Sequence, residues 1–151
     1  MKLAEILNED CCLFSMKATT KDEAINELAQ RLGDSGKLYS LEQFIAAVWK
    51  REEEFSTGVG EGLAIPHGKD DSVAVPALAY GFSKAGIEYG SFDEKPVHFV
   101  FMVAVPIKSD DLHLRLLAVI ARKLVHDSTR EKLKSAQNYE QLMSVFDDVE
   151  I

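Results

Sequence analysis

Two of the four histidines in this sequence stand where an imidazole could do chemistry. His67 follows proline and precedes glycine in the string Ala64-Ile-Pro-His-Gly68. Proline stiffens the approach to the ring and glycine leaves the next position bare, which suits attack on a group that a partner brings. His113 lies three residues after Asp110, in the first turn of a predicted helix, where free backbone N–H groups favour an anion. A lone histidine is more often structural, so spacing by itself leaves both roles open.

The other ionisable groups favour plainer interpretations. His98 lies in a predicted strand, where a surface or edge position is the default. His126 lies near the predicted end of a helix, where a cation interacts favourably with the helix dipole. The acidic runs at 52–54 and 147–148 are interpreted as solvated surface.

Several familiar catalytic motifs are absent. The segment Gly58-Val-Gly-Glu-Gly62 places its third glycine one residue too early for a dinucleotide-binding G-x-G-x-x-G. Five residues, not four, separate Gly62 from Gly68, and Lys69 is followed by aspartate, so there is no P-loop. No H-E-x-x-H, Cys/His cluster or G-x-S-x-G is present, so no metal site and no serine nucleophile elbow are predicted.

Length and composition indicate one cytoplasmic globular domain over residues 1–151. The chain is 46% hydrophobic and 28% charged, with a net charge of −8 that disfavours binding to nucleic acid. The only cysteines, Cys11 and Cys12, are adjacent and are expected to be free, buried thiols in a reducing compartment. Acidic residues near the N-terminus interrupt the apolar stretch that a signal peptide needs, so none is predicted. The longest apolar run is too short to cross a membrane.

Hydrophobic periodicity alternates between strands and helices along the chain. Apolar runs predict strands over 11–16, 74–83, 87–89 and 97–105, an extended stretch over 63–65 and a loop over 56–62. Helical spacing and capping signals predict helices that begin near Thr20, Ser40, Asp110 or Asp111, Thr129 and Asn138. Strands interleaved with helices predict an α/β (α+β) fold, in which helices flank both faces of a mixed β-sheet as a three-layer sandwich.

One segment is far more specific than these patterns. Residues 51–68 read Arg51-Glu-Glu-Glu-Phe-Ser-Thr-Gly-Val-Gly-Glu-Gly-Leu-Ala-Ile-Pro-His-Gly68. This string resembles the signature of the enzyme IIA domain of the bacterial phosphotransferase system (PTS), fructose–mannitol class (type 2). The segments 87–97, 105–106 and 113–118 are also similar, and 87–97 is most like the fructose type. The tail fits at Arg130, Leu133, Ala136 and 138–145. The resemblance therefore covers nearly the whole chain.

The resemblance implies a relay of phosphoryl groups between proteins. The small carrier HPr would donate to His67, and His67 would pass the group to a cysteine of enzyme IIB for uptake and phosphorylation of a fructose-like sugar. Family position also makes His113 the second active-site histidine and Arg51 the active-site arginine, and it favours Nε2 as the phosphorylated atom. No cofactor is expected because the phosphoryl group arrives on a protein. The membrane would be involved only through the sugar permease.

Residue chemistry is compatible with those roles. Phosphoryl transfer depends mainly on positioning and charge stabilisation. The planar guanidinium of Arg51 can bind two phosphoryl oxygens, and His113 can donate an N–H from a helix N-terminus. We expect backbone N–H groups of Thr57, Gly58 and Gly60, with the Thr57 hydroxyl, to bind phosphoryl oxygens. We also expect an apolar surface around His67 and a partner with a positive face.

Two other functions remain compatible with these residues. A nitrogen-type enzyme IIA is phosphorylated yet controls other proteins, and the fructose-like segment 87–97 argues modestly against that interpretation. A non-catalytic sensor would bind an anion at the glycine loop and transfer nothing. The combination of Arg51, His67 and His113 argues against the sensor, since anion binding by itself needs no nucleophile.

Overall fold

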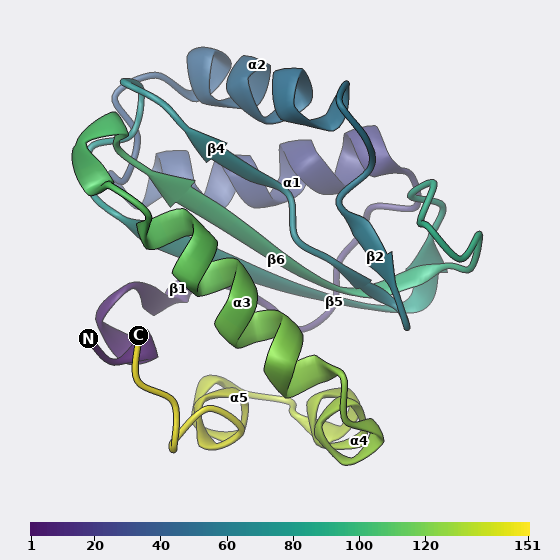
Figure 1. Ribbon diagram of the computed structural model, residues 1–151. Coiled ribbons are helices and arrows are strands. Elements are labelled where there is room, and N and C mark those ends of the chain that lie inside the picture. Colours follow the sequence, from purple (N-terminus) through teal and green to yellow (C-terminus); the bar gives the residue numbers. More distant parts are fainter.

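A mixed sheet of six strands forms the centre of the computed structural model, which describes residues 1–151 (Figure 1). The strands are β1 (Leu7–Leu13), β2 (Gly58–Gly60), β3 (Leu63–Ala64), β4 (His67–Lys69), β5 (Ala77–Ile87) and β6 (Val97–Val105). Their order is β1-β5-β6-β3-β2, and β4 also pairs with β6. The β1–β5, β3–β6 and β4–β6 pairs are parallel, whereas β5–β6 and β2–β3 are antiparallel.

Helices cover both faces of this sheet (Figure 1). One face packs against α1 (Lys21–Asp34) and α2 (Leu41–Glu52). The other packs against α3 (Leu112–Leu124), α4 (Asp127–Ser135), α5 (Tyr139–Ser144) and the short 3₁₀ turn η1 (Leu3–Glu5). A second 3₁₀ turn, η2 (Ile107–Ser109), follows β6 and has no buried residue. The predicted three-layer α/β arrangement is confirmed. None of these helices combines the length and the apolar character needed to span a bilayer.

The central strand β6 explains why the sequence shows a nearly continuous apolar run at 97–105, interrupted only by His98. Phe99, Phe101 and Val103 point into the core beneath α3, α4 and α5. The alternate residues Val100 and Met102 point into the core beneath α1 and α2. Because side chains alternate across a strand and both faces are covered, the buried positions on both faces are apolar, and the one polar residue, His98, is only half-buried.

Side-chain caps fix the start of three helices as predicted. The Thr20 and Ser40 hydroxyls accept from the amides of the third helical residues, at 3.3 and 3.2 Å, and the Asn138 carbonyl oxygen does the same at 2.9 Å. Asp111 is the N-cap residue of α3 but makes no side-chain cap hydrogen bond. His126 lies two residues beyond the end of α3 at Leu124, and it is also the N-cap residue of α4, without a side-chain cap hydrogen bond.

Short strands are where the structure departs from the sequence pattern. The predicted loop 56–62 contains β2, and β4 was not predicted at all. The stretch predicted as a separate strand at 87–89 only overlaps the end of β5 at Ile87. Strand β1 starts earlier than predicted because it is an edge strand, where the polar residues Glu9 and Asp10 can remain exposed. Strands of two or three residues carry too little periodicity to be recognised without their partners.

The adjacent cysteines are both free and buried, as expected. Cys11 faces the core beneath α1 and α2, whereas Cys12 faces the core on the other side of the sheet. Burial raises the pKa of the Cys12 thiol to about 12, so it remains protonated and unreactive at neutral pH.

Gly58 in β2 has no room for a side chain. An added Cβ would lie 2.8 Å from the Ser91 Cα and 3.0 Å from Tyr89 Cδ1. We expect Gly58→Ala to lower the free energy of unfolding by about 1–3 kcal/mol, because backbone and a buried ring must shift. Urea denaturation with Gly33→Ala in α1 as the matched control would test this. The Gly33 site has ordinary contacts at 3.6 Å, so alanine there should stabilise by about 0.5–1 kcal/mol. Equal stability of the two variants would contradict the close packing at Gly58.

Candidate functional site

A break between β3 and β4 sets the position of His67. Both short strands run parallel to β6, but Ile65 and Pro66 lie between them. Proline has no N–H to donate to a ladder, so the strand is interrupted there. The Ile65 N–H instead donates to the Thr57 carbonyl at 3.0 Å, and the Ile65 carbonyl lies 3.0 Å from Nδ1 of His67.

That contact determines the tautomer of His67. A carbonyl can only accept, so Nδ1 must carry the proton and donate it to the Ile65 carbonyl. Nε2 then keeps its lone pair. The residue is only 8% exposed, and this burial, helped by the nearby charge of Arg51, lowers the pKa of His67 below its ordinary value. The imidazole is therefore a neutral group with one free nucleophilic nitrogen.

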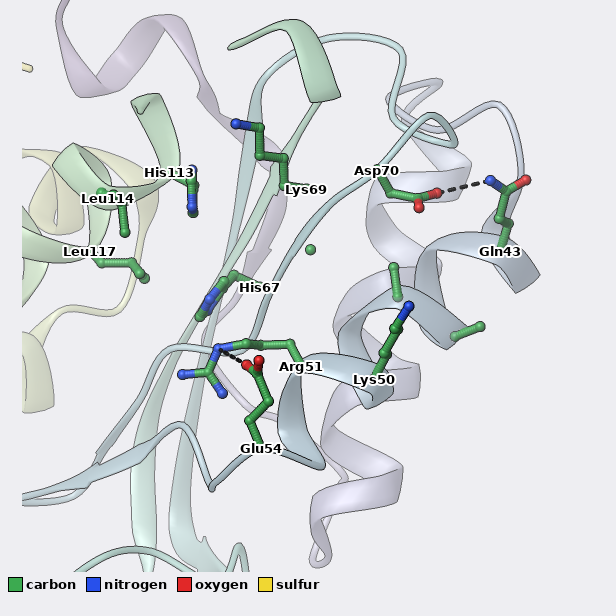
Figure 2. A pocket seen from close by; sticks show the side chains of 13 residues that line it. Gln43, Lys50, Arg51, Glu54, His67, Lys69, Asp70, His113, Leu114 and Leu117 are labelled. Atoms are coloured by element: carbon green, nitrogen blue, oxygen red, sulfur yellow. Dashed lines mark hydrogen bonds and ion pairs between the residues drawn. The ribbon is translucent and has the colours of Figure 1, made fainter. Parts of the chain in front are cut away.

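A cavity of about 720 Å³ lies beside His67, between α2, β4 and the start of α3 (Figure 2). It brings together the three residues assigned by resemblance to the active site: Arg51, His67 and His113. Two further cations, Lys50 and Lys69, and the carboxylates of Glu54 and Asp70 also line the cavity. The other lining residues are Gln43, Ala46, Ala47, Gly68, Leu114 and Leu117.

The Arg51 guanidinium is held at the end of α2. Its Nη1 donates to the Phe55 carbonyl at 3.0 Å, its Nε lies 3.5 Å from a Glu54 carboxylate oxygen, and its plane lies 4.5 Å from the Phe55 ring centroid. These contacts use Nη1 and Nε, so Nη2 remains available to bind an oxyanion. Figure 2 shows the guanidinium on the His67 side of the cavity.

His113 faces His67 from the first turn of α3. The two ring centroids are 6.3 Å apart, and the planes are tilted by 36°. Burial, followed by the nearby charge of Lys69, lowers the pKa of His113, and its buried Nδ1 has no hydrogen-bond partner. The Lys69 Nζ donates to the carbonyl of Asp110 at 2.5 Å, just before the helix. The two histidines therefore meet as neutral rings across a gap that an anion could fill.

Gly68 allows α2 to approach β4 closely. A Cβ at this position would lie 3.0 Å from the Phe44 ring and 3.4 Å from Val48, both on the inner face of α2. Since α2 carries Arg51 on its last turn and β4 carries His67, the missing side chain brings the two functional groups together.

The glycine loop is not part of this cavity. Thr57, Gly58 and Gly60, predicted to bind phosphoryl oxygens, are absent from its lining. The Thr57 amide donates to Glu52 at 3.1 Å, and the Gly58 amide donates to Ser56 Oγ at 3.1 Å. The Thr57 hydroxyl is bonded to Glu52 and Tyr89. These donors are therefore already engaged inside the protein.

Glu52 was misjudged from the sequence. The acidic run at 52–54 was interpreted as solvated surface, but the Glu52 side chain is 1% exposed, whereas Glu53 and Glu54 are exposed. The available signal was helical position: Glu52 lies four residues after buried Val48, on the inner face of α2. Lys50 and Lys69 were likewise not predicted as site residues.

The matching family model identifies the class of protein to which the chain belongs. Residues 5–149 match the family described as "Phosphoenolpyruvate-dependent sugar phosphotransferase system, EIIA 2". The chain belongs to this PTS EIIA type 2 family, whose members are phosphotransferase components.

Individual relatives include both sugar-specific and regulatory proteins. The fructose-specific EIIA component of Haloferax volcanii is 36% identical over 130 residues, covering 86% of this chain and 84% of that protein. The fructose-specific EIIABC component of Bacillus subtilis is 34% identical over 145 residues, which cover 96% of this chain but only 23% of that protein. The crystal structure of nitrogen regulatory protein IIA-Ntr from Neisseria meningitidis superposes with a TM-score of 0.88 at 27% identity, covering 95% of this chain and 97% of that one.

The lowered pKa of His67 gives a titration test. NMR titration of the imidazole resonances, assigned with His67→Gln, should give a midpoint for His67 below 6.5 because burial disfavours the imidazolium ion. The unfolded chain then binds the proton more readily, so stability should decline as pH falls below about 6.5. His67→Gln should make that decline less steep. A His67 midpoint above 6.5 would contradict the buried, neutral ring.

Proposed function

We propose that this protein is a PTS phosphocarrier that accepts a phosphoryl group from phospho-HPr on Nε2 of His67 and passes it to a cysteine of enzyme IIB. The observation that carries the proposal is the hydrogen bond from Nδ1 to the Ile65 carbonyl, which leaves Nε2 as the free nucleophile beside the cavity. The fructose-specific relatives from Bacillus subtilis and Haloferax volcanii support a role in fructose uptake.

Each transfer exchanges one phosphorus bond for another. In the first, the lone pair of His67 Nε2 attacks phosphorus while the N–P bond of the HPr phosphohistidine breaks. In the second, the cysteine thiolate of enzyme IIB attacks and the Nε2–P bond breaks. Arg51 and His113 are positioned to donate to the phosphoryl oxygens, whose charge is spread over three atoms in the transition state. The hydrogen bond at Nδ1 stays in place throughout and holds the ring.

Intact mass spectrometry would test the first transfer. After mixing with phosphoenolpyruvate, enzyme I and HPr, the protein should gain one acid-labile phosphoryl group. His67→Gln should gain none, and Arg51→Gln should slow the gain by about 10²–10³-fold because the charge on the phosphoryl oxygens is less stabilised. If HPr becomes phosphorylated and this protein does not, HPr is the wrong donor, and the anion-sensor alternative gains support.

Nitrogen regulatory relatives support a second candidate function. The Neisseria meningitidis IIA-Ntr structure and a nitrogen regulatory protein from Klebsiella oxytoca, 30% identical over 150 residues, cover nearly the whole chain. A regulatory protein of this type would be phosphorylated on the same histidine but would act on other proteins.

Transfer to enzyme IIB separates the two functions. The phosphorylated protein, freed of HPr, should lose its phosphoryl group to the cysteine of a fructose-type enzyme IIB, and a Cys→Ser variant of that enzyme IIB is the control acceptor. We expect loss within seconds to minutes with the cysteine present and none with serine. Stable phosphorylation in both mixtures would favour the nitrogen-type function.

A further inference from the structure

A chain of hydrogen bonds behind His67 begins at the buried carboxylate of Glu52. Its Oε1 accepts from Lys21 Nζ at 2.6 Å and from the Thr57 amide at 3.1 Å. Its Oε2 accepts from the Thr57 hydroxyl. A carboxylate with 1% exposure is tolerated in a protein interior only when paired and hydrogen-bonded in this way. Glu52 thus fixes both the backbone and the side chain of Thr57.

Tyr89 and Trp49 enclose the same cluster. The Thr57 hydroxyl has one proton, which goes to the carboxylate, so the Tyr89 hydroxyl at 2.8 Å must be the donor to Thr57 Oγ1. Burial raises the pKa of Tyr89, which keeps that donor proton in place. The ammonium of Lys21 lies 4.9 Å from the Tyr89 ring centroid and 5.6 Å from that of Trp49. Both Glu52 oxygens, the Thr57 and Tyr89 hydroxyls and the Lys21 ammonium therefore each have a partner.

The backbone groups of two residues, Thr57 and Ile65, connect this cluster to the active-site imidazole. The Thr57 carbonyl accepts from the Ile65 N–H at 3.0 Å, and the Ile65 carbonyl accepts from His67 Nδ1 at 3.0 Å. The following residue is Pro66, which lacks the N–H that a regular strand would use to hold this segment. Two hydrogen bonds therefore hold the backbone around the Ile65 carbonyl: the Ile65 N–H donates to Thr57, and the Val103 N–H donates to the Pro66 carbonyl at 3.0 Å. The first of these depends on Glu52, because Glu52 fixes Thr57.

We propose that Glu52 and Thr57 are positioning residues, which act through the Ile65 peptide to fix the tautomer and orientation of His67. The inference rests on the proposed function insofar as it predicts a transfer rate, but the tautomer is measurable without any transfer. When the Thr57 anchor is lost, the Ile65 carbonyl is no longer held toward Nδ1. The proton can then move to Nε2, and the lone pair leaves the cavity. A displacement of about 1 Å in a reacting group can cost about 10²-fold in rate.

Thr57→Val and Thr57→Ser are the informative pair of variants. Valine has a shape similar to threonine and keeps the amide bond to Glu52, but it lacks the hydroxyl that bonds Glu52 and Tyr89. Nitrogen-15 NMR of His67 should show the Nδ1–H form in the wild type and a mixture of tautomers in Thr57→Val. The maximal rate of phosphoryl acceptance from phospho-HPr should fall about 10–100-fold, with little change in the HPr concentration at half-maximal rate. Thr57→Ser should restore both. Glu52→Gln should act like Thr57→Val.

Tyr139→Phe controls for the loss of a semi-buried hydrogen bond. Its hydroxyl donates to the Leu7 carbonyl at 2.7 Å in the core on the other face of the sheet. This variant should lose stability while keeping the tautomer and the rate. If Thr57→Val also loses only stability, the cluster is merely structural and the inference fails. If the wild type accepts no phosphoryl group while Thr57→Val still shifts the tautomer, the proposed function fails and the positioning role stands.

Discussion

The hydrogen bond from Nδ1 of His67 to the Ile65 carbonyl decides which ring nitrogen is free, and the rest of the site depends on that bond. It exists because the strand paired with β6 is interrupted at Pro66. The interruption leaves Ile65 between two short strands. Its N–H donates to the Thr57 carbonyl, and its own carbonyl accepts from His67 Nδ1. The break in the sheet therefore holds the His67 ring with Nε2 free.

The three layers bring the other functional groups to that nucleophile from opposite faces of the sheet. Helix α2 crosses one face, close to β4 because Gly68 has no side chain, and carries Arg51 to the edge of the cavity. Helix α3 lies on the other face and presents His113 at its first turn (Figure 1). Neither helix could do this by itself, since the cavity exists only where both meet β4. Packing is therefore what turns three distant segments into one site.

Electrostatics near His67 differ from those of the chain as a whole. The protein carries a net charge of −8, yet its cavity is lined by three cationic side chains, Lys50, Arg51 and Lys69, and only two carboxylates. Burial lowers the pKa of both His67 and His113, and the effect is increased by Arg51 at His67 and by Lys69 at His113. The cavity thus combines two neutral imidazoles with an excess of positive charge, an arrangement that favours an anion.

Local sequence determined the features that depend on near neighbours: the caps at Thr20, Ser40 and Asn138, the apolar run of β6 and the Pro-His-Gly setting of His67. The resemblance in residues 51–68 indicated the family. Tertiary structure alone decided the rest. It formed β4, buried Glu52 and directed the Thr57 hydroxyl away from the cavity. These features depend on partners far away along the chain, because a three-residue strand or a buried carboxylate is stable only where the fold supplies its hydrogen bonds.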